Sequence, residues 1–126
     1  MLSTGVDILH VPRMEKAIDR YGQRILVRCF TAREIIACRG YPAEFAVRYA
    51  AKEAVSKALG VGLRVMARNG IRFHEVEILP DRFGKPHVQL HGYAAERAQE
   101  LGLTEWAVSL THEKEYAVAF VVAMSH

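Results

Sequence analysis

The sequence has few of the residues that mark a metal, redox or membrane protein. It contains only two cysteines, Cys29 and Cys38, without CxxC spacing or a neighbouring histidine cluster, so we expect reduced, partly buried thiols. Among its six histidines only His87 and His91 have HxxxH spacing, and the strand predicted over residues 87–90 holds them too far apart to share one ion, which argues against a zinc site. No apolar run approaches the length of a bilayer span, and the first residues lack the basic and apolar regions of a signal peptide. These absences predict a cytoplasmic protein without membrane contact.

Two common nucleotide and acyl-transfer motifs are also missing. The chain has neither a GxxxxGK[ST] loop nor a GxSxG elbow, which argues against a P-loop enzyme and an α/β-hydrolase. It has no internal repeat, linker or low-complexity segment. Its 126 residues, of which 51% are hydrophobic and 25% charged, have the composition of an ordinary globular protein. We therefore expect one domain spanning residues 1–126.

Charge is distributed unevenly along the chain. Residues 1–72 carry 13 Lys and Arg against 6 Asp and Glu, a net charge of +7. Residues 73–126 carry 4 against 8, a net charge of −4. The basic first half predicts an anionic partner, and nucleic acid, a polyphosphate cofactor and an acidic protein all satisfy that condition.

The longest helical pattern covers residues 44–59 and is rich in alanine. Arg48 and Lys52 share one flank of this helix, whereas Glu53 and Lys57 share another. The number of charges alone favours a solvated helix held by salt bridges. The apolar residues between the two pairs favour the alternative, a helix that is covered on several sides and keeps its charges inside.

The other patterns mix helices and strands without a strict βαβα order. Alternation of apolar and polar residues predicts strands over residues 2–9, 73–79, 87–90, 106–112 and 115–123, with a hairpin turn at Gly84. Helices are predicted from residue 12, from residue 31, where Thr31 and Glu34 form a capping box, and over residues 92–101. Residues 63–70 suit a loop or short helix. The expected fold class is α+β.

The last predicted strand is apolar on both faces. One face carries Tyr116, Val118, Phe120 and Val122, and the other carries Ala117, Ala119, Val121 and Ala123. The central helix can cover one of these faces. The other face needs a partner subunit or, in a monomer, the helix over residues 92–101.

Two carboxylates are candidates for chemistry. Asp7 lies on a predicted strand among apolar neighbours, and Gly5 on the same face leaves it an open approach, although Asp7 also suits a cap of the following turn. Together with Glu53 it would suit Mg²⁺, which prefers hard oxygen ligands and completes its shell with water and phosphate. Three cations are placed to neutralise such phosphates: Arg48, Lys52 and Lys57. This set of residues is typical of phosphoryl transfer.

A regular basic stripe follows the first strand. Arg13, Lys16 and Arg20 lie on one side of the helix, and Arg24 extends the stripe if the helix continues through Gly22. Such a stripe is either a solvated face or a docking surface for an acidic partner.

Several short motifs occur in a fixed order along essentially the whole chain: Gly5-Val6-Asp7, RYAAKEAVSKA at residues 48–58, Gly84-Lys85-Pro86, and SLTH at residues 109–112 followed by Tyr116-Ala117. With these motifs the sequence resembles holo-acyl-carrier-protein synthase, the small bacterial type of 4′-phosphopantetheinyl transferase. The R[FYW]AAKEA..K signature is highly specific, whereas the GVD and GKP motifs are specific only in its company.

The resemblance implies a phosphopantetheinyl transferase fold, in which a small antiparallel sheet packs on a long central helix. It implies transfer of the 4′-phosphopantetheine arm of coenzyme A to a serine of apo acyl carrier protein, releasing adenosine 3′,5′-bisphosphate, in support of fatty acid biosynthesis. Asp7 and Glu53 match its magnesium ligands, and Lys57 would pair with the same phosphates. Glu53, directly or through a metal-bound water, is our candidate for the base that accepts the serine proton.

The resemblance also implies where coenzyme A binds. Arg48 and His112 match contacts to its nucleotide, especially the 3′-phosphate, and Lys85-Pro86 match the segment against adenine. Gly84 and Thr111 belong to the same coenzyme-binding motifs. The chain lacks the basic residues that relatives often carry just before the central helix, so Arg39 and Arg64 are candidates for further 3′-phosphate contacts.

Two partners follow from the resemblance. An acidic helix of the carrier protein would dock on Arg13, Arg20 and Arg24. The chain would form a homotrimer in which His112 of one subunit approaches Asp7 and Glu53 of its neighbour. The alternative function is a small basic nucleic-acid-binding domain without catalytic activity, but the sequence shows neither the interleaved aromatics nor a motif that such a role predicts.

Overall fold

The computed structural model describes residues 1–63 and 70–126. The elements follow in the order β1 (Leu2–His10), α1 (Val11–Tyr21), α2 (Gln23–Cys29), α3 (Ala32–Cys38), α4 (Pro42–Leu59), η1 (Phe73–Glu75), β2 (Val76–Pro80), β3 (Pro86–Leu90), α5 (Gly92–Leu101), β4 (Glu105–Glu113) and β5 (Tyr116–Met124). Most of the segment at 63–70, for which we predicted a loop or short helix, lies outside the described residues.

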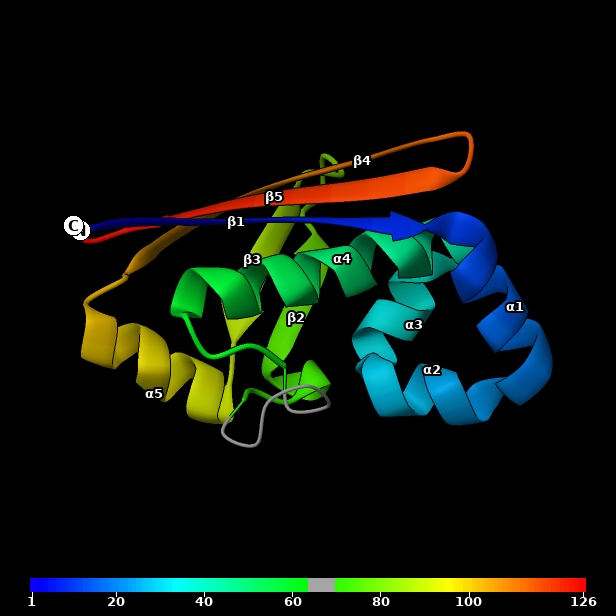
Figure 1. Ribbon diagram of the computed structural model, residues 1–126, viewed down its shortest axis with the longest axis horizontal. Coiled ribbons are helices and arrows are strands. Elements are labelled where there is room, and N and C mark those ends of the chain that lie inside the picture. Colours follow the sequence, from blue (N-terminus) through cyan, green and yellow to red (C-terminus); the bar gives the residue numbers. More distant parts are fainter. Residues whose placement is uncertain (64–69) are drawn as a thin grey trace.

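The strands form two separate antiparallel units. β5 lies between β1 and β4 in a three-stranded sheet, and β2 pairs with β3 in a hairpin. Figure 1 shows this sheet along one side of α4, with α1, α2 and α3 at one end of the molecule and α5 towards the other. The predicted α+β fold with an antiparallel sheet on a long central helix is therefore confirmed. Among the described residues, no helix has the length and apolar character of a membrane span.

The central helix α4 is enclosed rather than solvated. Of its 18 residues, 12 are buried, including Arg48 and Lys52, which are 4% and 0% exposed. The interpretation based on charge count was therefore wrong, because these two cations find partners inside the protein. Its alanines allow neighbouring elements to approach closely.

Three local predictions can be compared with the structure. Gly22 has a φ of +55° and ends α1, so Arg24 belongs to a second helix, α2, and does not extend the stripe of α1. Residues Phe73–Glu75 form a 3₁₀ turn, so the strand begins only at Val76. The predicted capping box of Thr31 and Glu34 is present and begins α3.

Both cysteines are free, and both are buried more completely than the expected partly buried thiols. Burial raises the pKa of the Cys38 thiol to about 12, which keeps it protonated at neutral pH. Cys29 has a pKa raised by the same cause. These thiols act as small core residues.

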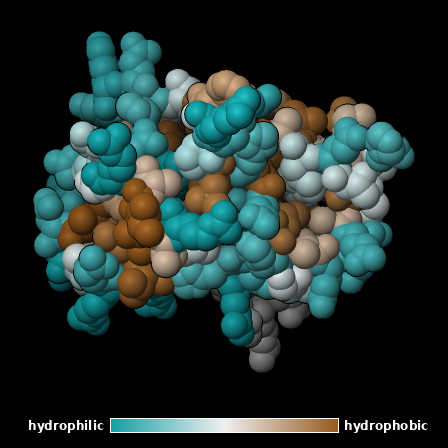
Figure 2. Space-filling view, turned by 180° about the vertical axis from the view of Figure 1, so that it is seen from behind, coloured by the Kyte–Doolittle hydropathy of each residue, from teal (hydrophilic) through white to brown (hydrophobic). Residues whose placement is uncertain are grey.

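In the part of the chain that the structure describes, no helix or strand covers the outer face of the three-stranded sheet (Figure 1). The alternative that α5 covers this face within one chain is wrong, because α5 packs against α4 and η1. Apolar side chains from two strands stay exposed there: Leu2, Val6, Ile8, Phe120 and Met124. Figure 2 shows the molecule from behind, where apolar patches are separated by hydrophilic groups.

The inner face of β1 lies against the backbone of α4 at Gly5. A Cβ atom on Gly5 would lie 2.7 Å from the carbonyl carbon of Ala54 and closer still to its oxygen. The predicted open approach beside Asp7 is thus filled by helix backbone. A side chain at position 5 would force the strand away from the helix.

We predict that Gly5→Ala lowers the free energy of unfolding by about 3 kcal/mol, because the overlap is with backbone and no rotamer change relieves it. Gly40→Ala is the matched control, since Gly40 has a φ of +80° but no atom within 4 Å of an added Cβ. It should cost only about 1 kcal/mol of conformational strain. Urea denaturation measures both values, and equal costs would contradict the close contact.

Candidate active site

Asp7, Glu53 and Lys57 come together between β1 and α4. Asp7 lies on the inner face of β1, and Lys57 donates hydrogen bonds to its Oδ1 at 2.9 Å and to the carbonyl of Val6 at 2.9 Å. Glu53 precedes Lys57 by one helical turn and therefore lies on the same face of α4. Asp7 does not cap the following turn, because the N-terminus of α1 has no side-chain cap.

The carboxyl group of Glu53 is electrostatically unsatisfied. Burial raises its pKa, and the neighbouring Asp7 carboxylate raises it further, whereas Lys57 and Arg13 lower it. A divalent cation would relieve the repulsion between the two acids. The pair suits Mg²⁺, which takes few protein ligands and keeps several waters. In residues 1–63 and 70–126, no group of three or more His, Cys, Asp or Glu is arranged to hold a metal.

The cations predicted to meet phosphates have different environments. Lys57 has a side chain that is 54% exposed and can contact a ligand. Lys52 is fully buried and donates to Glu34 and to the carbonyls of Phe73 and Val76. Our prediction that Lys52 neutralises phosphates was therefore wrong, because its ammonium group points away from Glu53 into the core.

A second group of predicted residues surrounds a hollow of about 350 Å³. Five of the predicted coenzyme contacts line it: Arg48, Gly84, Pro86, Thr111 and His112. Lys85 is exposed at the turn between β2 and β3. These residues come from α4, the hairpin and β4, so folding brings together motifs that lie far apart in the sequence.

The sequence reasoning missed an acid in this hollow. Glu44 accepts a hydrogen bond from Arg48 Nη1 at 2.9 Å, and its other oxygen lies 3.7 Å from His112 Nε2. The spacing of Glu44 and Arg48, four residues apart on a helix, is the signal that predicts their ion pair. Glu44 therefore occupies the position where an anionic group of a ligand would meet Arg48 and His112.

The two groups lie on different sides of α4. Arg48 and Glu53 are five residues apart, which turns their side chains by about 140° around the helix axis. Glu53 lines a separate hollow of about 400 Å³ together with Arg13 and Tyr49, and this hollow shares no lining residue with the one around His112. Within one chain, the structure does not join the predicted metal ligands to the predicted nucleotide contacts.

The predicted docking arginines lie at one end of the molecule. Arg13 and Arg20 lie on α1, and Arg24 lies on α2 beside Arg28, Tyr21 and Ile25 in a hollow of about 300 Å³. Arg13 also borders the hollow of Glu53, so the basic surface reaches the carboxylate cluster. Arg39 is exposed after α3, whereas Arg64 lies outside the described residues.

We predict that Glu53→Gln stabilises the metal-free protein at neutral pH. A raised carboxyl pKa means that the folded state holds the proton more tightly than the unfolded state, so stability falls as the pH rises through the folded pKa. The neutral amide of the variant has no charge to desolvate or repel. The melting temperature of the variant should exceed that of the wild type at pH 7 in a chelator, and the gap should close below the ordinary pKa of 4.5.

Glu15→Gln is the control for this experiment, because Glu15 is an exposed acid on α1. It should leave the melting temperature almost unchanged at both pH values. A Glu53→Gln protein no more stable than the wild type at pH 7 would contradict the unsatisfied carboxylate.

Comparison with known proteins identifies the family. The family model of the 4′-phosphopantetheinyl transferase superfamily matches residues 3–121. A holo-[acyl-carrier-protein] synthase of Herpetosiphon aurantiacus is 45% identical over 126 residues, covering 98% of this chain and 99% of the relative.

Solved structures agree with this assignment. The holo-[acyl-carrier-protein] synthase of Helicobacter pylori, in complex with coenzyme A, has a TM-score of 0.84 and 28% identity, covering 96% of this chain and 99% of that one. The enzyme of Neisseria meningitidis has a TM-score of 0.84 and 30% identity, with 98% of both chains covered. The alternative of a nucleic-acid-binding domain finds no support among these proteins. The chain is a phosphopantetheinyl transferase and belongs, with the holo-[acyl-carrier-protein] synthases, to the 4′-phosphopantetheinyl transferase superfamily.

Proposed function

We propose that this enzyme transfers the 4′-phosphopantetheine arm of coenzyme A to a serine of apo acyl carrier protein. The serine oxygen forms a bond to the phosphorus that bears pantetheine, the bond from that phosphorus to adenosine 3′,5′-bisphosphate breaks, and the serine proton passes to a base. The observation that carries the proposal is the cluster of Asp7, Glu53 and Lys57, which folding assembles from two distant segments of a family member.

Each residue of this cluster has a distinct task. Asp7 and Glu53 would hold Mg²⁺, which when bound neutralises charge on the coenzyme pyrophosphate. Lys57 is exposed enough to pair with the same phosphates. Its positive charge would stabilise the negative charge that develops on them during transfer. Glu53 is our candidate for the proton acceptor, because its raised pKa brings it closer to the operating pH than an ordinary glutamate.

The hollow around His112 suits the nucleotide of coenzyme A. Arg48 and His112 would meet its 3′-phosphate, and Gly84, Pro86 and Thr111 of the same hollow, together with the exposed Lys85, would contact its adenosine. Glu44 now pairs with Arg48, so a bound phosphate would replace the Glu44 carboxylate. Support for this part comes from the similar Helicobacter pylori enzyme, whose structure contains coenzyme A.

The test of the function is direct. The protein is incubated with coenzyme A, magnesium and an apo acyl carrier protein, and mass spectrometry detects the added phosphopantetheine. Asp7→Asn and Glu53→Gln should each lower the rate at least a hundredfold, because about 3 kcal/mol of electrostatic stabilisation of the transition state is lost. Near-normal turnover of either variant at saturating magnesium would overturn the assignment of the two carboxylates.

The same assay tests the docking surface. Arg20→Glu should raise the KM for carrier protein and reduce its dependence on salt, whereas the KM for coenzyme A should stay the same. The matched charge reversal is Arg97→Glu on α5, at the other end of the molecule (Figure 1), which should leave both KM values unchanged. If Arg20→Glu instead weakens coenzyme binding, the surface formed by Arg13 and Arg20 of α1 and Arg24 of α2 does not dock the carrier protein.

We further propose a homotrimer with active sites between subunits. Two observations support it: the outer sheet face exposes Val6, Ile8 and Phe120, and the two hollows of one chain do not meet. Closed threefold packing across that face would cover the apolar side chains and bring His112 of one subunit to Asp7 and Glu53 of the next.

Subunit mixing tests this arrangement. Asp7→Ala and His112→Ala proteins, each inactive alone, should regain activity after they are unfolded and refolded together, because some interfaces then receive both intact residues. Light scattering must show a trimer before and after mixing. Trimers that contain both variants but remain inactive would show that these residues do not meet across an interface.

A further inference from the structure

The edge of β2 that faces the core has side chains instead of a neighbouring strand. Among residues 1–63 and 70–126, the only strand that pairs with β2 is β3, on the other edge. In an extended strand, the backbone N–H and C=O groups of alternate residues point to the same edge. Glu77 directs these groups to β3, so Val76 and Ile78 direct theirs to the opposite edge, which faces the core. Buried backbone groups of this kind need partners.

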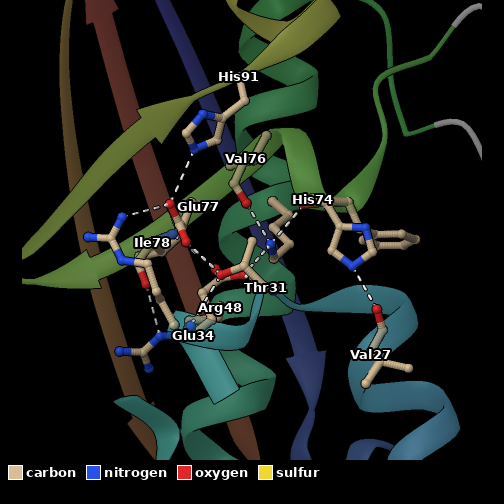
Figure 3. A network of polar contacts seen from close by, with 12 residues as sticks. Val27, Thr31, Glu34, Arg48, His74, Val76, Glu77, Ile78 and His91 are labelled. Atoms are coloured by element: carbon tan, nitrogen blue, oxygen red, sulfur yellow. Dashed lines mark hydrogen bonds and ion pairs between the residues drawn. The ribbon is translucent and has the colours of Figure 1, made fainter. Parts of the chain in front are cut away.

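Three side chains supply these partners, and Figure 3 labels two of them, Arg48 and Glu34. Lys52 donates to the carbonyl of Val76 at 2.5 Å, and Arg48 Nε donates to the carbonyl of Ile78 at 3.1 Å. Glu34 Oε2 accepts the N–H of Ile78 at 2.9 Å. These charged side chains bond to the backbone groups that a neighbouring strand would otherwise pair with. They connect β2 to α3 and α4.

Lys52 and Glu34 form the centre of this contact. They pair at 2.7 Å, and both are fully buried. Lys52 also donates to the carbonyl of Phe73 at 2.8 Å, which anchors the turn before β2. Within the described chain, no buried side-chain nitrogen or oxygen lacks a hydrogen-bond partner. The pair is therefore saturated and leaves no donor of Lys52 for a ligand.

A second contact reinforces the first. Thr31 donates to Glu77 Oε2 at 2.6 Å, and His91 lies 3.2 Å from Glu77 Oε1 (Figure 3). Thr31 is the N-cap of α3, and Glu34 lies in the first turn of the same helix, so two neighbouring residues of β2 are held by the start of α3. The hairpin thus has a fixed position relative to α3 and α4.

This anchorage bears on coenzyme binding. The hairpin carries Gly84 and Pro86, and Arg48 of α4 lies in the same hollow while it holds Ile78. We infer that Lys52 and Glu34 are positioning residues of the transferase, which set the place of the coenzyme-binding hairpin relative to Arg48. This inference rests on the proposed function. It assigns Lys52, the first lysine of the motif at residues 48–58, a role that involves no phosphate contact.

The experiment compares three variants. Glu34→Gln removes one charge and keeps the shape, and Lys52→Met removes the other with a similar chain length. Each single variant leaves one buried charge without its partner, which can prevent folding. The double variant removes both charges, so we expect it to fold even where a single variant does not. Each should raise the KM for coenzyme A roughly tenfold, while kcat and the KM for carrier protein stay within about twofold of the wild type.

Arg97→Met is the control for general destabilisation. Arg97 also joins an outer element to α4, because its Nε donates to the carbonyl of Leu59 at 3.1 Å, and its other hydrogen-bond partner is Glu100 of α5. Its removal should lower the melting temperature without a change in the KM for coenzyme A. Hydrogen exchange gives a readout that does not depend on transfer: the amides of residues 76–90 should exchange faster in the Glu34 and Lys52 variants, and those of β5 should not.

Several results would overturn the inference. A raised KM in Lys52→Met but not in Glu34→Gln would mean that Lys52 acts on the coenzyme by itself. A fall in kcat at constant KM, or unchanged kinetics and exchange in the folded double variant, would exclude positioning. If the wild type transfers nothing, the proposed function fails, but exchange at residues 76–90 still reports whether Lys52 and Glu34 fix the hairpin.

Discussion

The approach of β1 to α4 at Gly5 is the contact on which the arrangement of the site depends. Because position 5 has no side chain, the strand lies on the backbone of Ala54. Two residues further along β1, Asp7 is then within reach of Lys57, and Ser3 bonds to the carbonyl of Ala58. Any side chain at position 5 would separate the two carboxylate-bearing elements, so the position of Asp7 relative to α4 depends on Gly5.

The central helix joins two kinds of charged site. Lys52 faces β2 and has three partners within the chain, whereas Arg48 bonds to β2 through Nε and reaches the hollow around His112, where its Nη1 pairs with Glu44. Glu53 and Lys57 face β1 at the surface of a hollow. A helix with a single apolar stripe could pack against only one of these two strands. The scattered charges that first suggest a solvated helix are thus the result of packing on several sides.

The sequence predicted the parts that depend on local patterns. The strands, the capping box at Thr31 and the central helix follow from periodicity and from short-range side-chain chemistry. The break at Gly22 was less evident, since a glycine can either end or interrupt a helix, and only its φ of +55° decides between these outcomes.

Pairings between distant residues could not be predicted in the same way. Glu34 has the position of a capping residue, and nothing in its neighbourhood shows that it also meets Lys52, 18 residues away, and Ile78, 44 residues away. The separation of the hollow around His112 from the hollow of Glu53 could not be predicted either, because it depends on which side of α4 each strand covers. The carboxylates Asp7 and Glu53 were predicted as a pair because each lies among apolar or small residues and because both belong to motifs of a known family.

Lys52 and Glu53 are adjacent in the sequence, yet their environments differ in a way that separates structure from chemistry. Burial lowers the pKa of Lys52, but Glu34 opposes this effect, and three partners within 2.8 Å hold the ammonium group. Glu53 is only half-buried and has a like charge as a neighbour, so the fold leaves its charge unbalanced. A saturated ion pair has nothing to gain from a ligand. An acid beside another acid is stabilised by a cation, and this difference supports the proposal that Glu53, rather than the buried Lys52, acts on the substrate.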